Sequence, residues 1–433
     1  MTPKEFAAAV DPEQMLPEVL TTVAKLVSFD TVRRPPLPGM PFGKTTAEAL
    51  NWLIDLARAD GFKAENLDNY CGYIEYGEGE ELIAAACHLD VVPAGDPADW
   101  NTPPFEMVRD EEFIYGRGVS DNKGPMAVVY QLMREMKKRG VKLHRRFRLI
   151  VGCAEETGSE CLDHYCAHAE HPVYAFTPDA SYPVICGECG ILRFALEKRY
   201  KPGENRLFLK AGTVINAVPG RADAEYEGKK IHVEGKAAHA SHPESGDNAL
   251  LKLCAELKGK VDSDFPDLVS RLTREDMDLV LSDAVSKLTL VPSLAEADAD
   301  HAEVQCDIRF PVTMRSKEIV ARIEKFVSGT GYTLTIGGVE EPLYFPPDTP
   351  FVVELQKIYA EMTGDTESKP LVIGGGTYAK HLPNTVAFGC GFRGHASHAH
   401  GPNERRRLAN MMLNMRILAR AIAVLDELKI RED

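Results

Sequence analysis

The stretch Ala84-Ala85-Ala86-Cys87-His88-Leu89-Asp90-Val91-Val92-Pro93 decides how the rest of the chain is interpreted. Its apolar half is typical of a fully buried strand, and it ends in an imidazole and a carboxylate two positions apart. Because side chains alternate along a strand, we expect His88 and Asp90 on the same side. One ring nitrogen of His88 can then bind a metal while the Asp90 carboxylate accepts the proton on the other nitrogen. The alternative is a surface histidine beside an aspartate, and ligands elsewhere in the chain must decide between the two.

Two further predicted strands also end in carboxylates. They are residues 147–154, which precede Glu155 and Glu156, and residues 173–176, which precede Asp179. Neighbouring side chains at a strand end project in opposite directions, so we expect one glutamate to bind a metal and the other to face the substrate. Asp121 lies just before a predicted helix, where its carboxylate could cap backbone N–H groups, and this role does not exclude a place in the same site. Ligand sites lie at the carboxyl ends of strands in α/β folds, which favours a shared site for these groups.

The chain length and the order of the predicted helices and strands predict two domains. A chain of 433 residues exceeds the usual limit for a single core. Helices and strands alternate at first, which predicts an α/β fold with a central, mostly parallel sheet flanked by helices. After Gly190 the predicted elements change to successive strands with alternating side chains, which predicts an inserted α+β lid domain. We therefore expect a catalytic domain in two segments, residues 1–186 and 342–433, with the lid domain at residues 187–341.

Composition excludes several classes of partner. The formal net charge of −15 argues against nucleic acid and against an anionic membrane surface. The N-terminus has no signal-peptide pattern, and we expect no run long enough to span a bilayer. The 10 cysteines lack the dense framework of a small secreted domain. We predict a cytoplasmic protein with reduced thiols.

Motifs in a fixed order cover nearly the whole chain. They are His88-Leu89-Asp90-Val91-Val92-Pro93, Gly116-Arg117-Gly118 with Asp121 and Lys123-Gly124-Pro125, Glu155-Glu156-Thr157-Gly158-Ser159, Asp179, Gly235-Lys236-Ala237-Ala238-His239-Ala240, and His400 with Glu404. Together they resemble the metallopeptidase family that includes aminoacylase, carboxypeptidase G, carnosinase and succinyl-diaminopimelate desuccinylase. The bacterial Xaa-His dipeptidase branch is the most similar, through Phe176-Thr177-Pro178-Asp179-Ala180, Asn216-Ala217-Val218-Pro219 and Gly375-Gly376-Thr377-Tyr378-Ala379.

The resemblance implies a site with two divalent metal ions. Asp121 would bridge the ions, His88 and Asp179 would complete one, and Glu156 and His400 the other. Imidazole with carboxylate suits zinc, and a more oxygen-rich site also admits manganese or cobalt. His398 lies two positions from His400, so the spacing to Glu404 alone selects His400 as the ligand.

The resemblance also implies the catalytic roles. Glu155 would be the general base, and Asp90 would support the ligand His88. His239 would stabilise the oxyanion from the lid domain, within one chain or across a dimer. Asn216 and Arg309 would hold the substrate, since the planar guanidinium of Arg309 matches a peptide's terminal carboxylate.

The sequence therefore predicts a metallohydrolase that cleaves an amide bond in a small peptide, most consistent with a dipeptidase. It would be a monomer or a homodimer through the lid domain. One alternative is an N-acyl-amino-acid amidohydrolase or a desuccinylase of the same family. Another is a catalytically silent binding protein, against which the presence of Glu155 with all five ligands argues.

Overall fold

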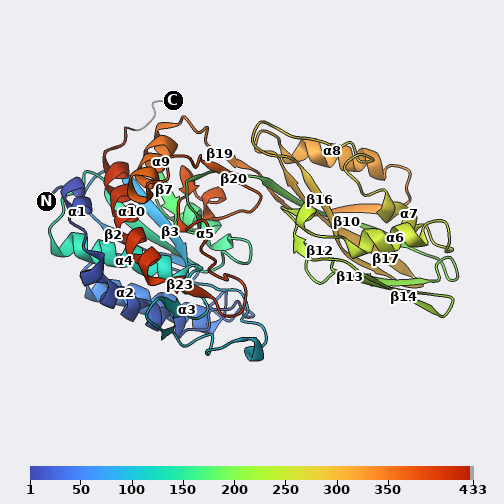
Figure 1. Cartoon of the computed structure of the whole chain (residues 1–433), viewed down its shortest axis with the longest axis horizontal. Coiled ribbons are helices and arrows are strands. Elements are labelled where there is room, and N and C mark those ends of the chain that lie inside the picture. The colour runs from blue at the N-terminus through green and yellow to red at the C-terminus, as the bar shows by residue number, and fades with distance from the viewer. Residues whose placement is uncertain (430–433) are drawn as a thin grey trace. The chain divides into compact units, whose positions relative to one another are not determined.

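The computed structural model describes residues 1–429, which fall into two compact units (Figure 1). The first unit consists of Met1–Cys186, Phe345–Leu371 and the described residues from Thr377 onward. The second consists of Gly187–Tyr344 and Val372–Gly376. The chain leaves the second unit after Tyr344, whereas the sequence placed that boundary after residue 341. The short piece Val372–Gly376 also belongs to the second unit, although its glycine-rich sequence gave no sign of this.

A mixed sheet with a parallel centre forms the core of the first unit. Four adjacent strands, β6, β3, β7 and β21, run parallel, and antiparallel strands continue the sheet on both sides. All seven residues of β3 are buried, as a strand covered on both faces requires. The predicted α/β class is confirmed. In order across the sheet the strands are β1 (Lys63–Leu67), β2 (Cys71–Tyr76), β6 (Arg146–Gly152), β3 (Leu82–His88), β7 (Tyr174–Thr177), β21 (Thr385–Ala387), β9 (Ile185–Glu188) and β19 (Leu343–Tyr344), and β20 (Leu371–Ile373) also pairs with β9.

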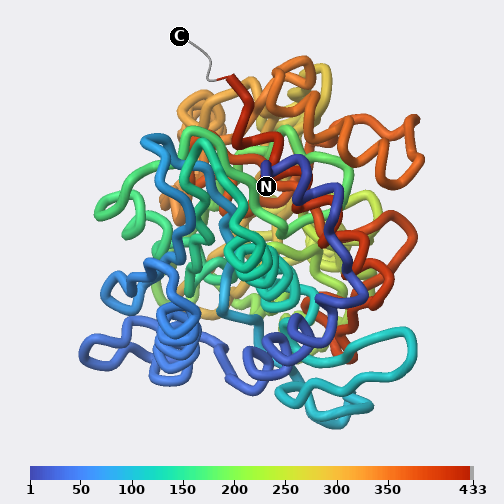
Figure 2. The backbone as a smooth tube through the Cα atoms, turned by 90° about the vertical axis from the view of Figure 1, so that its left-hand side faces the viewer, coloured from blue at the N-terminus to red at the C-terminus, as the bar shows by residue number. Residues whose placement is uncertain are grey.

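Amphipathic helices cover this sheet. Helices α4 and α10 pack against β3, and α3 packs against β1 and β2. Helix α1 packs against α10, which brings the first and last described helices together (Figure 2). The helices of the first unit are α1 (Pro3–Ala8), α2 (Pro12–Val27), α3 (Lys44–Ala59), α4 (Lys123–Lys138), α5 (Glu160–His168), α9 (Pro350–Thr363) and α10 (Leu408–Glu427), with short 3-10 turns η1 (Pro97–Asp99) and η3 (Tyr378–Lys380).

Helix α10 departs from one expectation. It is long and apolar enough, with a mean hydropathy of 1.4, to cross a bilayer by length and composition alone, whereas we expected no such run. Of the 18-residue apolar stretch of that helix, 61% is buried inside the protein. It packs against α1, α2, α4, α9 and β3, so burial in the core explains its composition.

Two small sheets complete the first unit near its loops. One has three antiparallel strands, β23 (Arg405–Arg407), β5 (Phe113–Tyr115) and β4 (Val108–Arg109). The other pairs β22 (Cys390–Gly391) with β8 (Ala180–Ser181).

The second unit is an α+β domain built on a seven-stranded antiparallel sheet, as the sequence predicted. One face of the sheet packs with helices around a single apolar cluster that includes Leu253, Phe265 and Ile323. The strands in order are β14 (Lys229–Glu234), β13 (Arg221–Tyr226), β11 (Leu207–Ala211), β16 (Thr289–Ala297), β17 (His301–Phe310), β10 (Gly190–Arg199) and β18 (Thr333–Glu340). The helices are α6 (Ala249–Leu257), α7 (Phe265–Ser270) and α8 (Ser316–Val327), with a short turn η2 (Pro243–Ser245) and a two-stranded ladder of β12 (Ala217–Val218) and β15 (Ala238–His239).

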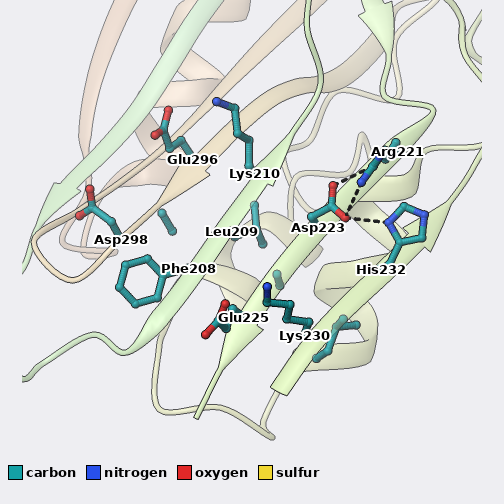
Figure 3. Close-up of a pocket in the computed structure, with 13 residues that line it drawn as sticks. Phe208, Leu209, Lys210, Arg221, Asp223, Glu225, Lys230, His232, Glu296 and Asp298 are labelled. Atoms are coloured by element: carbon teal, nitrogen blue, oxygen red, sulfur yellow. Dashed lines mark hydrogen bonds and ion pairs between the residues drawn. The ribbon is translucent and has the colours of Figure 1, made fainter. Parts of the chain in front are cut away.

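The other face of this sheet carries polar side chains. A hollow of about 730 Å³ lies over β11, β13, β14 and β16 (Figure 3). Within it, Asp223 binds both Arg221 at 2.8 Å and His232 at 2.7 Å. None of the predicted site residues lines the hollow. We interpret it as the solvated face of a one-sided antiparallel sheet.

Candidate metal centre

The structure brings six predicted residues together at the carboxyl end of the parallel strands. They come from separate parts of the first unit: His88 ends β3, Glu155 and Glu156 follow β6, Asp179 follows β7, Asp121 precedes α4, and His400 lies ahead of β23. Parallel strands end at one edge of their sheet, which is why groups far apart in the sequence meet there.

Contacts of Nδ1 with Asp90 fix the orientation of the His88 ring. Its Nδ1 lies 2.9 Å from the backbone carbonyl oxygen of Asp90 and 3.5 Å from the Asp90 carboxylate. The expected partner was the carboxylate, but the carbonyl is the closer acceptor. A proton held on Nδ1 leaves Nε2 as the ligand atom.

The Asp90 carboxylate has a different role. Its two oxygens accept hydrogen bonds from the backbone N–H groups of Glu155, at 3.1 Å, and of Glu156, at 3.0 Å. Asp90 is almost fully buried. It therefore ties the end of β3 to the turn that carries the two glutamates.

Asp121 lies between the two histidines. Its Oδ1 is 2.9 Å from Nε2 of His88, and its Oδ2 is 3.0 Å from Nε2 of His400. No side chain caps the N-terminus of helix α4, so Asp121 does not have the capping role. One carboxylate with one oxygen toward each histidine is the arrangement that a bridging ligand needs.

Glu155 and Glu156 converge instead of diverging. Oxygens of both carboxylates and a ring nitrogen of His88 all lie within 4.8 Å of one another. The expectation of opposite directions was wrong because β6 ends at Gly152 and both residues lie in the turn that follows, where strand alternation no longer applies.

Asp179 is positioned by Asn122, the residue that follows Asp121 in the sequence. Asn122 is fully buried, and its Nδ2 donates to Oδ1 of Asp179 at 2.9 Å and to the carbonyl of Pro178 at 3.0 Å. The other carboxylate oxygen of Asp179 lies 3.4 Å from Nε2 of His88. A donor at this position orients Asp179, which an acidic residue could do only if protonated.

Crowded carboxylates dominate the electrostatics. Burial raises the pKa of Glu155 well above its ordinary value, and the charge of Asp179 adds to the effect. Burial likewise raises the pKa of Glu156 to about 7. Burial would also raise the pKa of Asp121, but hydrogen bonds from His400 and His88 lower it below its usual range. Hydrogen bonds to Asp121 and Glu156 raise the pKa of His400 to about 11. The cluster thus favours positive charge between its oxygens.

The residues fit divalent metal ions. His88, Asp121 and Asp179 form one group of three possible ligands, and Asp121, Glu156 and His400 form another. Oε1 of Glu156 is buried and has no hydrogen-bond partner among the described residues. A buried carboxylate oxygen without a donor is costly, and a cation would satisfy it. Mixed imidazole and carboxylate ligands suit zinc and its neighbours in the first transition row.

Comparison with known proteins decides the family. The family model described as peptidase family M20/M25/M40 matches residues 84–424, which include every residue of the centre. The chain belongs to this family. The resemblance inferred from the motifs is confirmed.

Individual M20 relatives cover almost the whole chain. A Bacillus subtilis protein named "Putative dipeptidase YtjP" is 32% identical over 430 residues, covering 89% of this chain and 92% of its own length. Human carnosine dipeptidase 1 superposes with a TM-score of 0.62 at 15% identity, covering 98% of this chain and 99% of that one. Aminoacylhistidine dipeptidase from Vibrio alginolyticus gives 0.61 at 15% identity, covering 98% and 99%. The two structures establish the fold that this M20 chain shares with them.

Glu404 holds the loop that carries Asp121, a role that its spacing from His400 did not reveal. Its fully buried carboxylate accepts from Nη1 of Arg117 at 2.8 Å and from the backbone N–H groups of Gly118, Ser120 and Asp121 at 3.0, 2.8 and 3.1 Å. The Gly116-Arg117-Gly118 motif thus supplies hydrogen-bond donors to the Glu404 carboxylate. One buried carboxylate joins the segment of His400 to the loop of Asp121.

Replacing Glu404 with Gln should lower the free energy of unfolding of the metal-free protein by about 3 kcal/mol, because it leaves buried Arg117 without a counter-charge. It should also weaken metal binding, because the Asp121 loop loses its anchor. Chemical denaturation and metal titration measure the two effects. Glu361→Gln is the matched control, since Glu361 pairs with Arg420 at the surface and should change stability by about 1 kcal/mol or less. Equal effects of the two substitutions would contradict the role of Glu404.

The other three predicted residues of this M20 chain lie in the second unit. His239 is exposed at the end of β15, and its Nδ1 accepts the backbone N–H of Ser241 at 3.2 Å and lies 2.7 Å from the Ser241 hydroxyl. An acceptor at Nδ1 places the proton of the neutral ring on Nε2. The carbonyl of exposed Asn216 accepts the N–H of Ala240, so Asn216 lies beside the His239 strand.

Arg309 is buried and already paired. Its Nε and Nη2 bind the Asp307 carboxylate at 2.6 and 3.1 Å, and its Nη1 donates to the carbonyl of Gly374 at 2.9 Å. Ser241 packs against Gly374, where a Cβ would approach the serine side chain at 2.4 Å. His239, Asn216 and Arg309 therefore belong to one cluster of the second unit. Asp307 pairs with Arg309 and occupies two of its five N–H groups.

Proposed function

We propose that this chain is a dipeptidase that uses two divalent metal ions, with zinc the first choice and manganese or cobalt also compatible with the ligands. The supporting observation is the pair of three-ligand groups that share Asp121 and lie next to Glu155. The name of the Bacillus subtilis relative adds support for a dipeptide as the substrate.

Each residue of the centre then has one role. His88 and Asp179 would hold one ion, Glu156 and His400 would hold the other, and Asp121 would serve both. Bound there, such ions would supply Lewis-acid chemistry, which makes a water more acidic and polarises the scissile carbonyl. Asp90 acts indirectly, by holding His88 and the turn of Glu155 and Glu156 in place.

Glu155 moves the proton. Burial raises the pKa of Glu155, which makes its carboxylate a stronger base than an ordinary glutamate and helps it keep the proton it accepts. In hydrolysis Glu155 takes a proton from the attacking water and returns it to the departing amine. Its place beside two possible ligands keeps it within reach of the reaction.

The second unit supplies donors to the substrate. His239 with its proton on Nε2 is suited to stabilise the negative oxygen that develops on the attacked carbonyl. Two of the five N–H groups of Arg309 are not used by Asp307 and Gly374. We propose that these, with the side chain of Asn216, bind the dipeptide's terminal carboxylate.

The test is a substrate panel with controlled metal content. Metal-depleted protein should not hydrolyse dipeptides, and adding zinc, manganese or cobalt should restore turnover. Dipeptides should be cleaved faster than N-acetyl or N-succinyl amino acids. Release of acetate or succinate without turnover of any dipeptide would favour the amidohydrolase or desuccinylase alternative.

The cellular location and the oligomeric state of the enzyme are also proposed. We propose a cytoplasmic enzyme, supported by ten cysteines that are all free. We also propose that the chain acts as a monomer or as a homodimer through the second unit.

A further inference from the structure

A small pocket in the first unit is lined by an unusual concentration of positive charge. Its volume is about 190 Å³, and Arg405, Arg406 and Arg407 of β23 all contribute to its lining. Three consecutive arginines are unexpected in a chain with a net charge of −15. The only carboxylate among the lining residues is Glu112. The side chains of the metal centre are not part of the lining.

Arg406 distinguishes this pocket from an ordinary basic surface. It is only 7% exposed, and its Nη2 donates to the carbonyl of Cys390 at 3.1 Å. Its buried Nε has no hydrogen-bond partner, and no carboxylate pairs with Arg406 in the part of the chain that the structure describes.

Other buried arginines of this chain are paired. Arg117 binds Glu404, Arg148 binds Glu75, and Arg309 binds Asp307. A buried cation without a counter-charge is costly. Arg406 therefore lacks the negative partner that the same side chain has elsewhere in the protein.

The neighbouring groups also favour an anion. Helix α10, with 20 residues, begins directly after Arg407, and no side chain caps its first turn. The side chain of Asn410, in that turn, lines the pocket. Arg407 pairs with Glu112 at 2.6 Å, which leaves Arg405 and Arg406 as excess charge. A helix N-terminus beside arginines is a favourable place for an oxyanion.

We propose that this pocket binds a small phosphate-type oxyanion, either inorganic phosphate or the phosphate group of a small metabolite. Its volume lies below the usual range for drug-sized ligands, which favours a group of this size. The anion would supply the counter-charge that Arg406 lacks, beside the first turn of α10.

Occupancy would also order the chain that leads to His400. His395 and Ser397 line the same pocket, and the carbonyl of Ser397 accepts the N–H of Arg405 at 2.8 Å. Nδ1 of His395 already lies 2.9 Å from Nδ2 of Asn410 in α10, and an anion beside this pair would add a second link between the segment 395–397 and the helix. The inference does not depend on the substrate of the metal centre.

The test uses the metal-loaded protein with inorganic phosphate, and separately with glycerol phosphate, at constant ionic strength. Isothermal titration gives the affinity, and hydrogen exchange locates the effect. Phosphate should slow exchange of the backbone amides between residues 390 and 411. The ligand that binds more tightly identifies the source of the anion.

Arg406→Met should weaken phosphate binding at least about tenfold, because a charge-assisted hydrogen bond is lost. Arg405→Met, at a more exposed position, is the second variant if Arg406→Met does not fold. Arg416→Met is the matched control, since Arg416 is exposed on the same helix outside the pocket and should leave binding unchanged. Absence of binding to wild-type protein would overturn the proposal. Equal protection in wild type and both pocket variants would also overturn it, because phosphate would then bind only at the metal centre.

Discussion

Glu155→Gln should lower kcat by about 10²-fold or more while both metal ions are retained. A general base contributes rate enhancement of this order, and the amide cannot accept the proton. Gln keeps the size of the side chain, and Glu155 is not needed to complete either of the two ligand groups that share Asp121. Steady-state kinetics on a dipeptide, with metal content measured on the same sample, give the result.

The adjacent Glu156 is the matched control. Glu156→Gln changes the same residue type in the same turn, but it removes a carboxylate from the group formed with Asp121 and His400. We expect it to lower metal content as well as kcat, whereas Glu155→Gln lowers kcat alone. Unchanged turnover of Glu155→Gln, or equal metal loss in the two variants, would contradict the division of roles between these neighbours.

The strand pattern predicted most residues of the metal centre, because these residues follow buried strands that the local sequence reveals. An apolar run that ends in His88 has few ways to bury itself, and the carboxyl ends of parallel strands share one edge. The same reasoning predicted that Glu155, Glu156 and Asp179 belong to the centre. The choice of His400 over His398 agrees with the geometry, since His400 contacts Asp121 and Glu156.

What the sequence missed depends on turns and on long-range partners. The turn after β6 makes Glu155 and Glu156 converge, and alternation predicts the opposite. The bond from His88 to a backbone carbonyl leaves no sequence signal. Glu404 contacts Arg117 from 287 positions away, so only the fold joins them. Asp307 and Arg309, in contrast, lie two positions apart on β17 and share one face, so their pairing could have been read from the sequence.

Asp121→Ala should remove both metal ions, and with them all dipeptide hydrolysis. Asp121 belongs to both ligand groups, and its two oxygens face different histidines at 2.9 and 3.0 Å. Elemental analysis after dialysis should fall from about two ions per chain to near zero. Asp179→Ala is the comparison, because Asp179 belongs to only one of these two groups and its loss should chiefly affect one ion.

Thermal unfolding separates metal loss from misfolding in Asp121→Ala. A ligand that binds only the native state raises Tm, so added zinc should stabilise the metal-depleted wild type. It should leave the Tm of Asp121→Ala nearly unchanged, because neither ion keeps its full set of ligands. A cooperative transition for the variant shows that it folds, so the missing response then reports the site itself. If Asp121→Ala kept two ions per chain and a normal rise in Tm with zinc, Asp121 would not be the bridge, and the centre would have to be rebuilt around other oxygens.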